Sequence, residues 1–315
     1  MAPDRPADAT GGLGFAVDLG RGLTLPNPVG VASGTFGYGF ELEALCEVGR
    51  LGAIFTKGTT RLARPGNPPP RVAETPAGML NAIGLQNPGV ETVCRDYAPR
   101  WRRWPVPVLV NVAGADVAEY VEVVRRLDGV GGVAGIELNI SCPNVAGGLD
   151  FGLEPKAAAG CVAAVRAATA QPLVVKLSPN AADIAEVARA VADAGADAVS
   201  AINTVIGLKV SLPRRRPVLP GAGTGGLSGP AIRPVALAAV ARVRRAVTIP
   251  VIGVGGIVTA ADALEFFVAG ADAVQVGTAT FVEPGAALAV LDGCRGYARR
   301  AGIASLSELR WTGGG

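Results

Sequence analysis

Short runs of apolar residues recur at fairly even intervals along this chain of 315 residues. Within each run the hydrophobic positions are continuous rather than alternating, which is typical of parallel strands that helices cover on both faces. The pattern predicts eight buried strands, at residues 29–33, 53–57, 108–113, 135–141, 172–178, 198–203, 250–256 and 273–278.

The segments between these strands read as helices. Residues 182–195, for example, place Ile184, Val187, Ala188 and Val191 on one face at helical spacing. Strand and helix alternating eight times predict either a closed barrel or a large doubly wound sheet.

A short internal repeat favours the barrel. The sequence AGADAV occurs at residues 194–199 and again at 269–274, each time where a helix leads into a strand, although such a turn suits any α/β fold. Two Gly- and Pro-rich segments, 61–85 and 207–226, follow strand ends, where a barrel carries its active-site loops. We therefore predict an α/β fold, a (β/α)₈ TIM barrel with inserted active-site loops.

Composition supports one large globular unit. Half of the residues are hydrophobic and 17% are charged, so the chain can bury a substantial core. We expect one domain over residues 1–315, with residues 1–14 as a flexible tail. The net charge of +3 and the lack of a long basic stripe argue against nucleic acid, and the run Arg214–Arg216 is interpreted as a solvated hairpin edge rather than a docking surface. The longest uncharged stretch, 247–261, is too short and too broken to span a membrane.

Cysteine and histidine usage limits the chemistry. The five cysteines are an odd number and none forms a CxxC pair, which fits a reducing cytoplasm and argues against a metal site in this chain. Histidine is absent, which excludes hydrolases of the Ser/His/Asp or Cys/His type. A general base here must be Cys, Lys, Asp, Glu or Tyr.

Polar and small residues close the apolar runs, and catalytic residues of a barrel lie at these carboxyl ends. Together they describe a cavity for a polar, partly anionic, planar molecule. They are Ser33, Lys57, Asn111, Asn139, Cys142, Lys176, Asn203, Gly255, Gly256, Gly277 and Thr278.

The glycines and the lysines of this set predict different contacts with a ligand. Glycines at the ends of the last two strands are typical of a phosphate site, although two ordinary turns would look alike; FMN fits this late position better than a Rossmann-type NAD site. Lys57 and Lys176 each need an anionic partner if they point inward, the alternative being exposure to solvent. If the ligand is a flavin, we expect Lys176 to stabilise the negative charge that develops near N1 and C2=O.

Cys142 stands apart from the other cysteines. It follows a strand in a loop beside Pro143, where a thiol is a plausible proton acceptor or donor at a substrate carbon. The remaining cysteines are expected to be small buried hydrophobes. They are Cys46, Cys94, Cys161 and Cys294.

The segment LNISCPN at 138–144 resembles the catalytic-loop motif of the dihydroorotate dehydrogenases. Further resemblances follow in order over roughly residues 20–290. They include NPVGVASGTFGYG at 27–39, FTKGTT at 55–60, NAIGLQNPG at 81–89, NVAG at 111–114, VVKLSPN at 174–180, AINT at 201–204, GGLSGPAIRP at 225–234, GVGGI at 253–257 and QVGTA at 275–279. A cysteine at 142 resembles class 1, and NAIGLQNPG looks like the NAD-linked subtype rather than the fumarate-linked one.

The resemblance implies that Cys142 removes the C5 proton of dihydroorotate while hydride passes from C6 to N5 of FMN, giving orotate. Lys176 would assist. The resemblance implies FMN contacts from Ser33, Lys57, Gly58, Asn111, Asn139, Lys176, Ile202, Gly229, Gly255, Gly256, Gly277 and Thr278. It implies substrate contacts from Lys57, Asn81, Ala82, Ile83, Gly84, Leu85, Asn139, Asn144, Asn203 and Thr204.

The subtype also implies a partner. Electrons would reach NAD through a separate subunit with FAD and a 2Fe–2S cluster, in a heterotetramer built on a homodimer. Three alternatives stay open: a related flavin barrel acting on another pyrimidine, a fumarate-linked class 1 enzyme, and a non-catalytic FMN- or phosphosugar-binding barrel, which would give no reason for Cys142 or for the two lysines.

Overall fold

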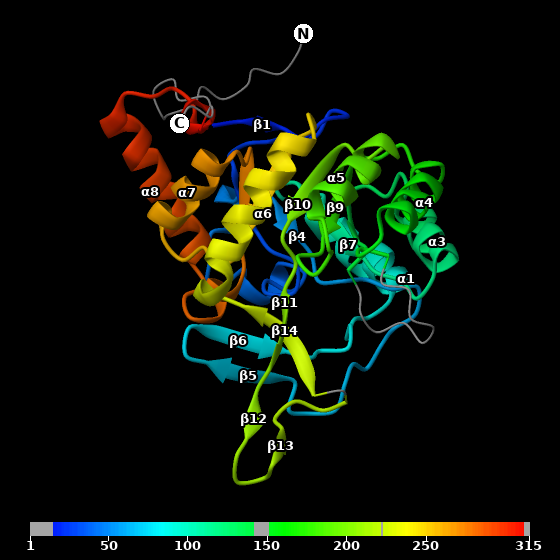
Figure 1. Cartoon of the computed structure of the whole chain (residues 1–315). Coiled ribbons are helices and arrows are strands. Elements are labelled where there is room, and N and C mark those ends of the chain that lie inside the picture. Colours follow the sequence, from blue (N-terminus) through cyan, green and yellow to red (C-terminus); the bar gives the residue numbers. More distant parts are fainter. Residues whose placement is uncertain (1–14, 142–150, 222, 312–315) are drawn as a thin grey trace.

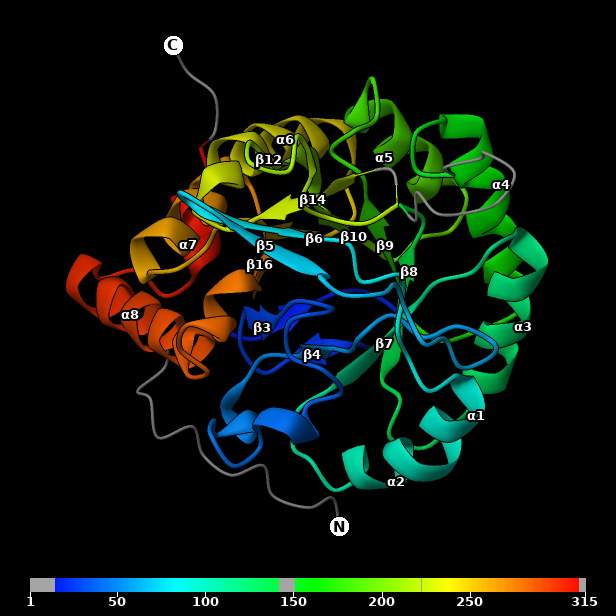
Figure 2. The same ribbon diagram turned by 90° about the horizontal axis from the view of Figure 1, so that it is seen from below.

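The computed structural model describes residues 15–141, 151–221 and 223–311. Eight parallel strands close into a barrel, in agreement with the predicted TIM-barrel fold (Figure 2). In order around the barrel they are β3 (Val29–Val31), β4 (Ile54–Phe55), β7 (Val108–Val112), β8 (Gly135–Asn139), β9 (Leu173–Leu177), β10 (Ala198–Ala201), β15 (Val251–Val254) and β16 (Ala273–Val276).

All eight predicted strands are confirmed, and each ends before its predicted carboxyl end. Residues 56 and 57, for example, follow β4 without extending it. Thr56 is still fully buried and Lys57 is half-buried, although neither belongs to the strand.

Helices surround the barrel, as Figure 2 shows. They are α1 (Val90–Thr92), α2 (Ala98–Trp101), α3 (Val117–Leu127), α4 (Pro155–Arg166), α5 (Ile184–Asp193), α6 (Arg233–Ala246), α7 (Ala260–Ala269) and α8 (Ala286–Ala301), with a π-helical turn, η3 (Val93–Tyr97), between the first two. The face predicted for α5 is confirmed, since Ile184, Val187, Ala188 and Val191 are all buried. In the part of the chain that the structure describes, no helix is long and apolar enough to cross a membrane.

The connection from β3 to β4 departs from the expected alternation. It contains two 3₁₀ turns, η1 (Phe40–Leu42) and η2 (Val48–Arg50), instead of an α-helix. Gly37 and Gly39 have φ of 60° and 95°, which a continuous helix does not allow. An aromatic group fills the space, with the ring of Phe40 5.3 Å from that of Trp104.

The barrel interior is closed toward the amino ends of the strands by the hairpin β1 (Val17–Asp18) and β2 (Thr24–Leu25). Leu19, Leu23 and Leu25 are buried in one cluster with the lumen residues Leu109 and Val174. This apolar plug leaves the carboxyl ends as the end of the barrel where polar side chains gather.

The two inserted segments combine into one sheet across the carboxyl ends. Strands β5 (Val72–Thr75) and β6 (Gly78–Asn81) come from the first insertion, and β11 (Val205–Leu208) and β14 (Thr224–Ser228) follow β10; they pair antiparallel in the order β11, β14, β6, β5 (Figure 1). The hairpin of β12 (Val210–Ser211) and β13 (Arg216–Pro217) projects from it, and its three arginines are exposed, as expected for a solvated hairpin edge.

The AGADAV repeat turns out to be a repeated structural unit. Asp197 Oδ2 accepts the backbone N–H of Leu173 at 2.9 Å and an Arg166 N–H at 3.0 Å. Asp272 Oδ2 accepts the N–H of Val251 at 2.8 Å and an Arg244 N–H at 3.3 Å. Each aspartate therefore ties the start of a barrel strand to the arginine of the preceding helix.

We predict that Asp272→Asn lowers the free energy of unfolding by about 2–3 kcal/mol, because it leaves the half-buried Arg244 guanidinium without its carboxylate. Urea denaturation measures this loss. The control is Asp96→Asn in the exposed Arg95–Asp96 pair, where little change is expected. Equal midpoints for the two variants would contradict the structural role of the repeat.

Candidate active site at the carboxyl ends of the barrel strands

The residues predicted to form a site lie at one end of the barrel. Because all eight strands are parallel, the residues that end them or follow them meet at the same face. Ser33 follows β3, Lys57 and Gly58 follow β4, Asn111 lies in β7, Asn139 ends β8, Lys176 lies in β9, Ile202 to Thr204 follow β10, Gly255 and Gly256 follow β15, and Gly277 and Thr278 follow β16.

A buried polar network lies below this face, around the fully buried Glu137 of β8. Its Oε1 accepts Ser200 Oγ at 2.8 Å and Gln275 Nε2 at 3.1 Å, and its Oε2 accepts Asn111 Nδ2 at 2.7 Å. Lys176 Nζ lies 3.7 Å from Oε1 and donates to Gln275 Oε1 at 3.1 Å. One carboxylate thus connects side chains from four other strands.

Lys176 is 5% exposed, so the prediction that it points inward is confirmed. Burial lowers the pKa of this lysine, whereas the adjacent Glu137 acts in the opposite direction. Sequence reasoning missed Glu137, Ser200 and Gln275. The sequence did carry a signal for this network, namely the carboxylate of Glu137 in the apolar run IELN and the amide of Gln275 in AVQV.

Asn111 has one side of its amide satisfied and one side open. Its Nδ2 donates to Glu137, while its Oδ1 is buried and has no hydrogen-bond partner among the described residues. A Cβ on Gly58 would stand 3.3 Å from that oxygen. A buried acceptor without a donor is costly, which marks this atom as a contact for a ligand.

Asn139 and Asn203 form a second pair of amides. Asn203 Nδ2 donates to Asn139 Oδ1 at 3.2 Å, and the Asn203 Oδ1 accepts the N–H of Thr204 at 2.9 Å. The backbone carbonyl of Asn139 accepts Tyr120 Oη at 2.6 Å, which anchors the end of β8 to α3. The structure therefore brings together three of the predicted substrate contacts.

Lys57 is half-buried at the edge of the site. Burial lowers its pKa; Glu41 opposes this effect and Arg71 adds to it. The Nζ atom lies 3.4 Å from Gln86 Oε1, which also accepts an N–H of Arg71. The ammonium group is therefore only partly compensated.

The loop at 81–85 lies beside Lys57. Asn81 Nδ2 donates to the carbonyl of Gly226, Gly84 has φ of 72° against Asn67, and Leu85 has φ of 55°. The buried Asn87, which sequence reasoning missed, donates to the carbonyl of Leu85 at 2.7 Å. Ala82 and Ile83 are half-buried between these anchors.

The predicted phosphate contacts gather near the start of α6. A Cβ on Gly256 would stand 2.9 Å from the carbonyl of Gly229 and 3.0 Å from the backbone N of Arg233. Thr278 Oγ1 donates to Ser228 Oγ at 2.8 Å. Gly255 and Gly277 follow β15 and β16, and Ser33 follows β3, the strand that pairs with β16. Ile202 is buried and donates its N–H to the carbonyl of Val254.

Cys142 and Asn144 lie outside the described residues. Ser141, directly before them, donates its N–H to Asn139 Oδ1 at 3.3 Å. Cys46, Cys161 and Cys294 are buried as expected. The expectation was wrong for Cys94, which is only partly buried because the π-helical turn η3 leaves its thiol near the surface, against the carbonyl of Arg126.

Comparison with known proteins agrees with this geometry. The family model described as dihydroorotate dehydrogenase matches residues 19–295. The chain belongs to the dihydroorotate dehydrogenase family.

Several similar proteins share one name. A protein of Desulforudis audaxviator is 55% identical over 91% of this chain and 94% of its own length, and is named "Dihydroorotate dehydrogenase B (NAD(+)), catalytic subunit". Proteins with the same name from Geotalea uraniireducens and Porphyromonas gingivalis are 53% and 50% identical, over 91% and 93% of this chain and 94% and 95% of their own lengths.

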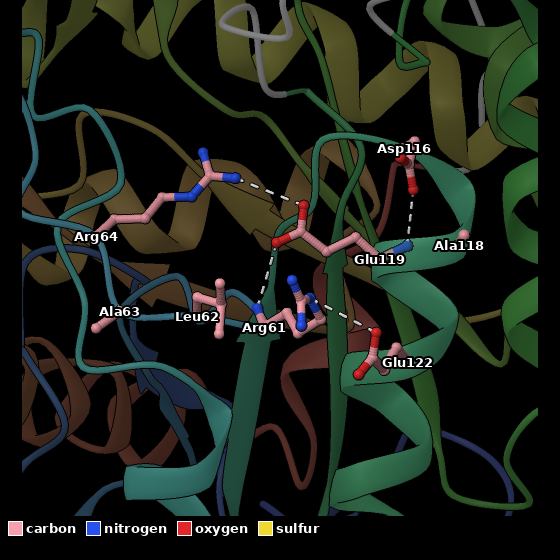
Figure 3. A pocket seen from close by; sticks show the side chains of 8 residues that line it. All are labelled: Arg61, Leu62, Ala63, Arg64, Asp116, Ala118, Glu119 and Glu122. Atoms are coloured by element: carbon pink, nitrogen blue, oxygen red, sulfur yellow. Dashed lines mark hydrogen bonds and ion pairs between the residues drawn. The ribbon is translucent and has the colours of Figure 1, made fainter.

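A groove between the loop after β4 and the start of α3 is lined by charged side chains that pair with one another (Figure 3). Its volume is about 570 Å³. Glu119 accepts the N–H of Arg61 at 3.3 Å and that of Ala115 at 2.7 Å, and it pairs with Arg64; Arg61 pairs with Glu122. None of the predicted ligand contacts lines this groove, so Glu119 serves to hold the loop after β4 against α3.

We predict that Gly256→Ala lowers the free energy of unfolding by about 2–4 kcal/mol, because it combines a left-handed φ of 72° with a clash against Gly229. The control is Gly129→Ala, which has φ of 70° with open space around it and should cost only about 1 kcal/mol. Urea denaturation of both variants separates the two effects. If Gly256→Ala cost no more than the control, the close packing of the glycine group would be refuted.

Proposed function

We propose that this chain is an FMN-dependent oxidoreductase that converts dihydroorotate to orotate for pyrimidine biosynthesis. The observation that carries the proposal is the convergence of Lys176, Asn111 and the Asn139–Asn203 pair at the carboxyl end of a closed barrel. Membership of the dihydroorotate dehydrogenase family and the names of its relatives support the substrate. In this proposal residues 1–315 form one FMN-binding domain.

The residues of the site fit FMN. Asn111 offers an unsatisfied buried acceptor next to Gly58, and Lys176 offers a buried cation for the electron-rich edge of a flavin ring. Gly255 and Gly256 pack closely against the start of α6, since an added Cβ would stand 2.7 Å from Ala236 Cβ or from Arg233 Cβ. In the proposal the backbone N–H groups at this helix start, together with Gly229 and Gly277, bind the phosphate. The other proposed FMN contacts are Ser33, Lys57, Asn139, Ile202 and Thr278. When bound, FMN supplies an acceptor for hydride.

The substrate would lie over Lys57, Asn139 and Asn203, with Thr204 and the loop at 81–85 around it. Amide groups offer both donors and acceptors, which match the two kinds of edge on a pyrimidine, and Lys57 matches a carboxylate. Asn144 joins this set in the proposal. The anchoring of Asn203 by Thr204 and Asn139 keeps its amide in one orientation, so the site discriminates between ligands with different edges.

In the proposed reaction Cys142 accepts the proton from C5 of dihydroorotate. Lys176 stabilises the negative charge that develops on the flavin ring. We extend the proposal to the assembly: a homodimer in the cytoplasm, joined in a heterotetramer by a subunit with FAD and a 2Fe–2S cluster that passes electrons to NAD. The words "NAD(+)" and "catalytic subunit" in the names of the relatives support this extension.

The first test is anaerobic mixing of the FMN-loaded protein with dihydroorotate while flavin absorbance is followed. Rapid bleaching is expected in the wild type, with a rate roughly 10²–10⁴ times lower in Cys142→Ala because the base is lost. Cys94→Ala, which lies in η3 outside the site, should bleach like the wild type. Flavin that binds but stays oxidised would reject dihydroorotate and favour a related flavin barrel, and failure to bind flavin would reject the cofactor.

The affinity for orotate should fall as the pH rises, because the orotate carboxylate binds the charged form of Lys57. Burial lowers the pKa of Lys57, so the fall should begin at a lower pH than an ordinary lysine would give. Affinity is thus complete below the pKa of Lys57 in the free protein and is lost above it. Titration calorimetry across pH measures the effect. Lys57→Gln should bind about tenfold more weakly and lack this step, and Lys57→Arg should shift it beyond the measurable range. A step of the same size in Lys57→Gln would assign it to another group.

A further inference from the structure

Glu137 has no place in the site as the sequence motifs define it, although it is the most connected side chain beneath it. It is fully buried and accepts hydrogen bonds from Ser200, Gln275 and Asn111. Every one of these contacts uses the carboxyl group as an acceptor, which is the role of the ionised form. The carboxylate is also 3.7 Å from Lys176 Nζ.

Its first effect concerns charge. Lys176 and Glu137 form a pair inside a closed barrel, where charges are poorly screened and each compensates the other. Gln275 bridges them, because its Nε2 donates to Glu137 while its Oε1 accepts from Lys176. A ligand above Lys176 therefore meets a cation whose charge is largely offset.

Its second effect concerns the polarity of Asn111. A carboxylate accepts hydrogen bonds and donates none, so the Asn111 amide has to point its Nδ2 toward Glu137. The Asn111 Oδ1 is then left as the buried, unsatisfied acceptor beside Gly58. A glutamine at 137 could present its own NH₂ to Asn111, and the Asn111 amide would reverse.

We propose that Glu137 is a positioning residue that sets the redox potential of the bound flavin, by offsetting the charge of Lys176 and fixing Asn111 as an acceptor. The inference rests on the proposed function, since it requires FMN at this site. Glu137 acts through the two side chains above it and is not itself assigned a contact with the cofactor.

The direction of the effect follows from the charge. Glu137→Gln removes one buried negative charge, leaves the Lys176 cation uncompensated and so favours the reduced flavin, which is the more negative form. We expect the equilibrium constant for two-electron reduction to rise about tenfold or more, which is about 30 mV. The affinity for FMN should fall about tenfold as Asn111 loses its acceptor orientation.

The experiment measures the midpoint potential of FMN bound to the wild type and to Glu137→Gln, together with the FMN dissociation constant by fluorescence. Glu119→Gln is the matched control, because it removes a carboxylate of the groove in Figure 3 that has no contact with the barrel network. Its potential should equal that of the wild type. With rising pH the potential of Glu137→Gln should also fall more steeply than that of the wild type, because burial lowers the pKa of Lys176 and Glu137 no longer opposes this effect.

An unchanged potential in Glu137→Gln would overturn the inference even if FMN bound more weakly, because a purely structural role would also weaken binding. If Glu137→Gln fails to fold, the midpoint potential is compared between Lys176→Met and the double variant Lys176→Met/Glu137→Gln. Removing both buried charges is tolerated better than removing one. The second change should again raise the potential, and no rise would refute the role of Glu137. A wild type that binds no FMN would instead refute the proposed function.

Discussion

The ion pair between Glu137 and Lys176 is the interaction on which the site depends. A single buried charge inside a barrel is strongly unfavourable, so each of the two residues offsets the cost of burying the other. Their pairing is possible only because β8 and β9 are neighbours and Gln275 reaches across from β16. The closed barrel therefore does more than support the site: it supplies the low-dielectric surroundings in which the charges of Glu137 and Lys176 act strongly on each other.

The rest of the architecture maintains these surroundings from three directions. The leucines around the first hairpin exclude water from the amino end of the lumen. The aspartates of the AGADAV repeat fix the starts of β9 and β15 against their helices. The sheet formed by the insertions crosses the carboxyl end and brings Asn81 against Gly226, so that the loop with Leu85 stands over the strand ends.

The sequence predicted the parts that rest on local pattern. The eight strands, the buried face of α5 and the inward direction of Lys176 all follow from runs of apolar residues and from the cost of burying an ammonium group. The motif around residues 138–144 identified the family, although Cys142 itself lies outside the described residues. The glycines at the ends of the last two strands were also visible in the sequence, where a phosphate site and two ordinary turns look alike, and their role stays a prediction.

What the sequence did not predict depends on contacts between distant segments. The pairing of β6 with β14 joins Asn81 to Gly226. Segments rich in Gly and Pro have no periodicity from which this pairing could be predicted. Glu137 was missed for a related reason. Attention to strand ends selects residues that face a ligand, whereas Glu137 lies within β8 and its importance appears only when Asn111, Lys176, Ser200 and Gln275 are known to converge on it. An acidic residue within an otherwise apolar strand of a barrel therefore has to be explained by the charge or the donors that it compensates, because no such residue is buried without them.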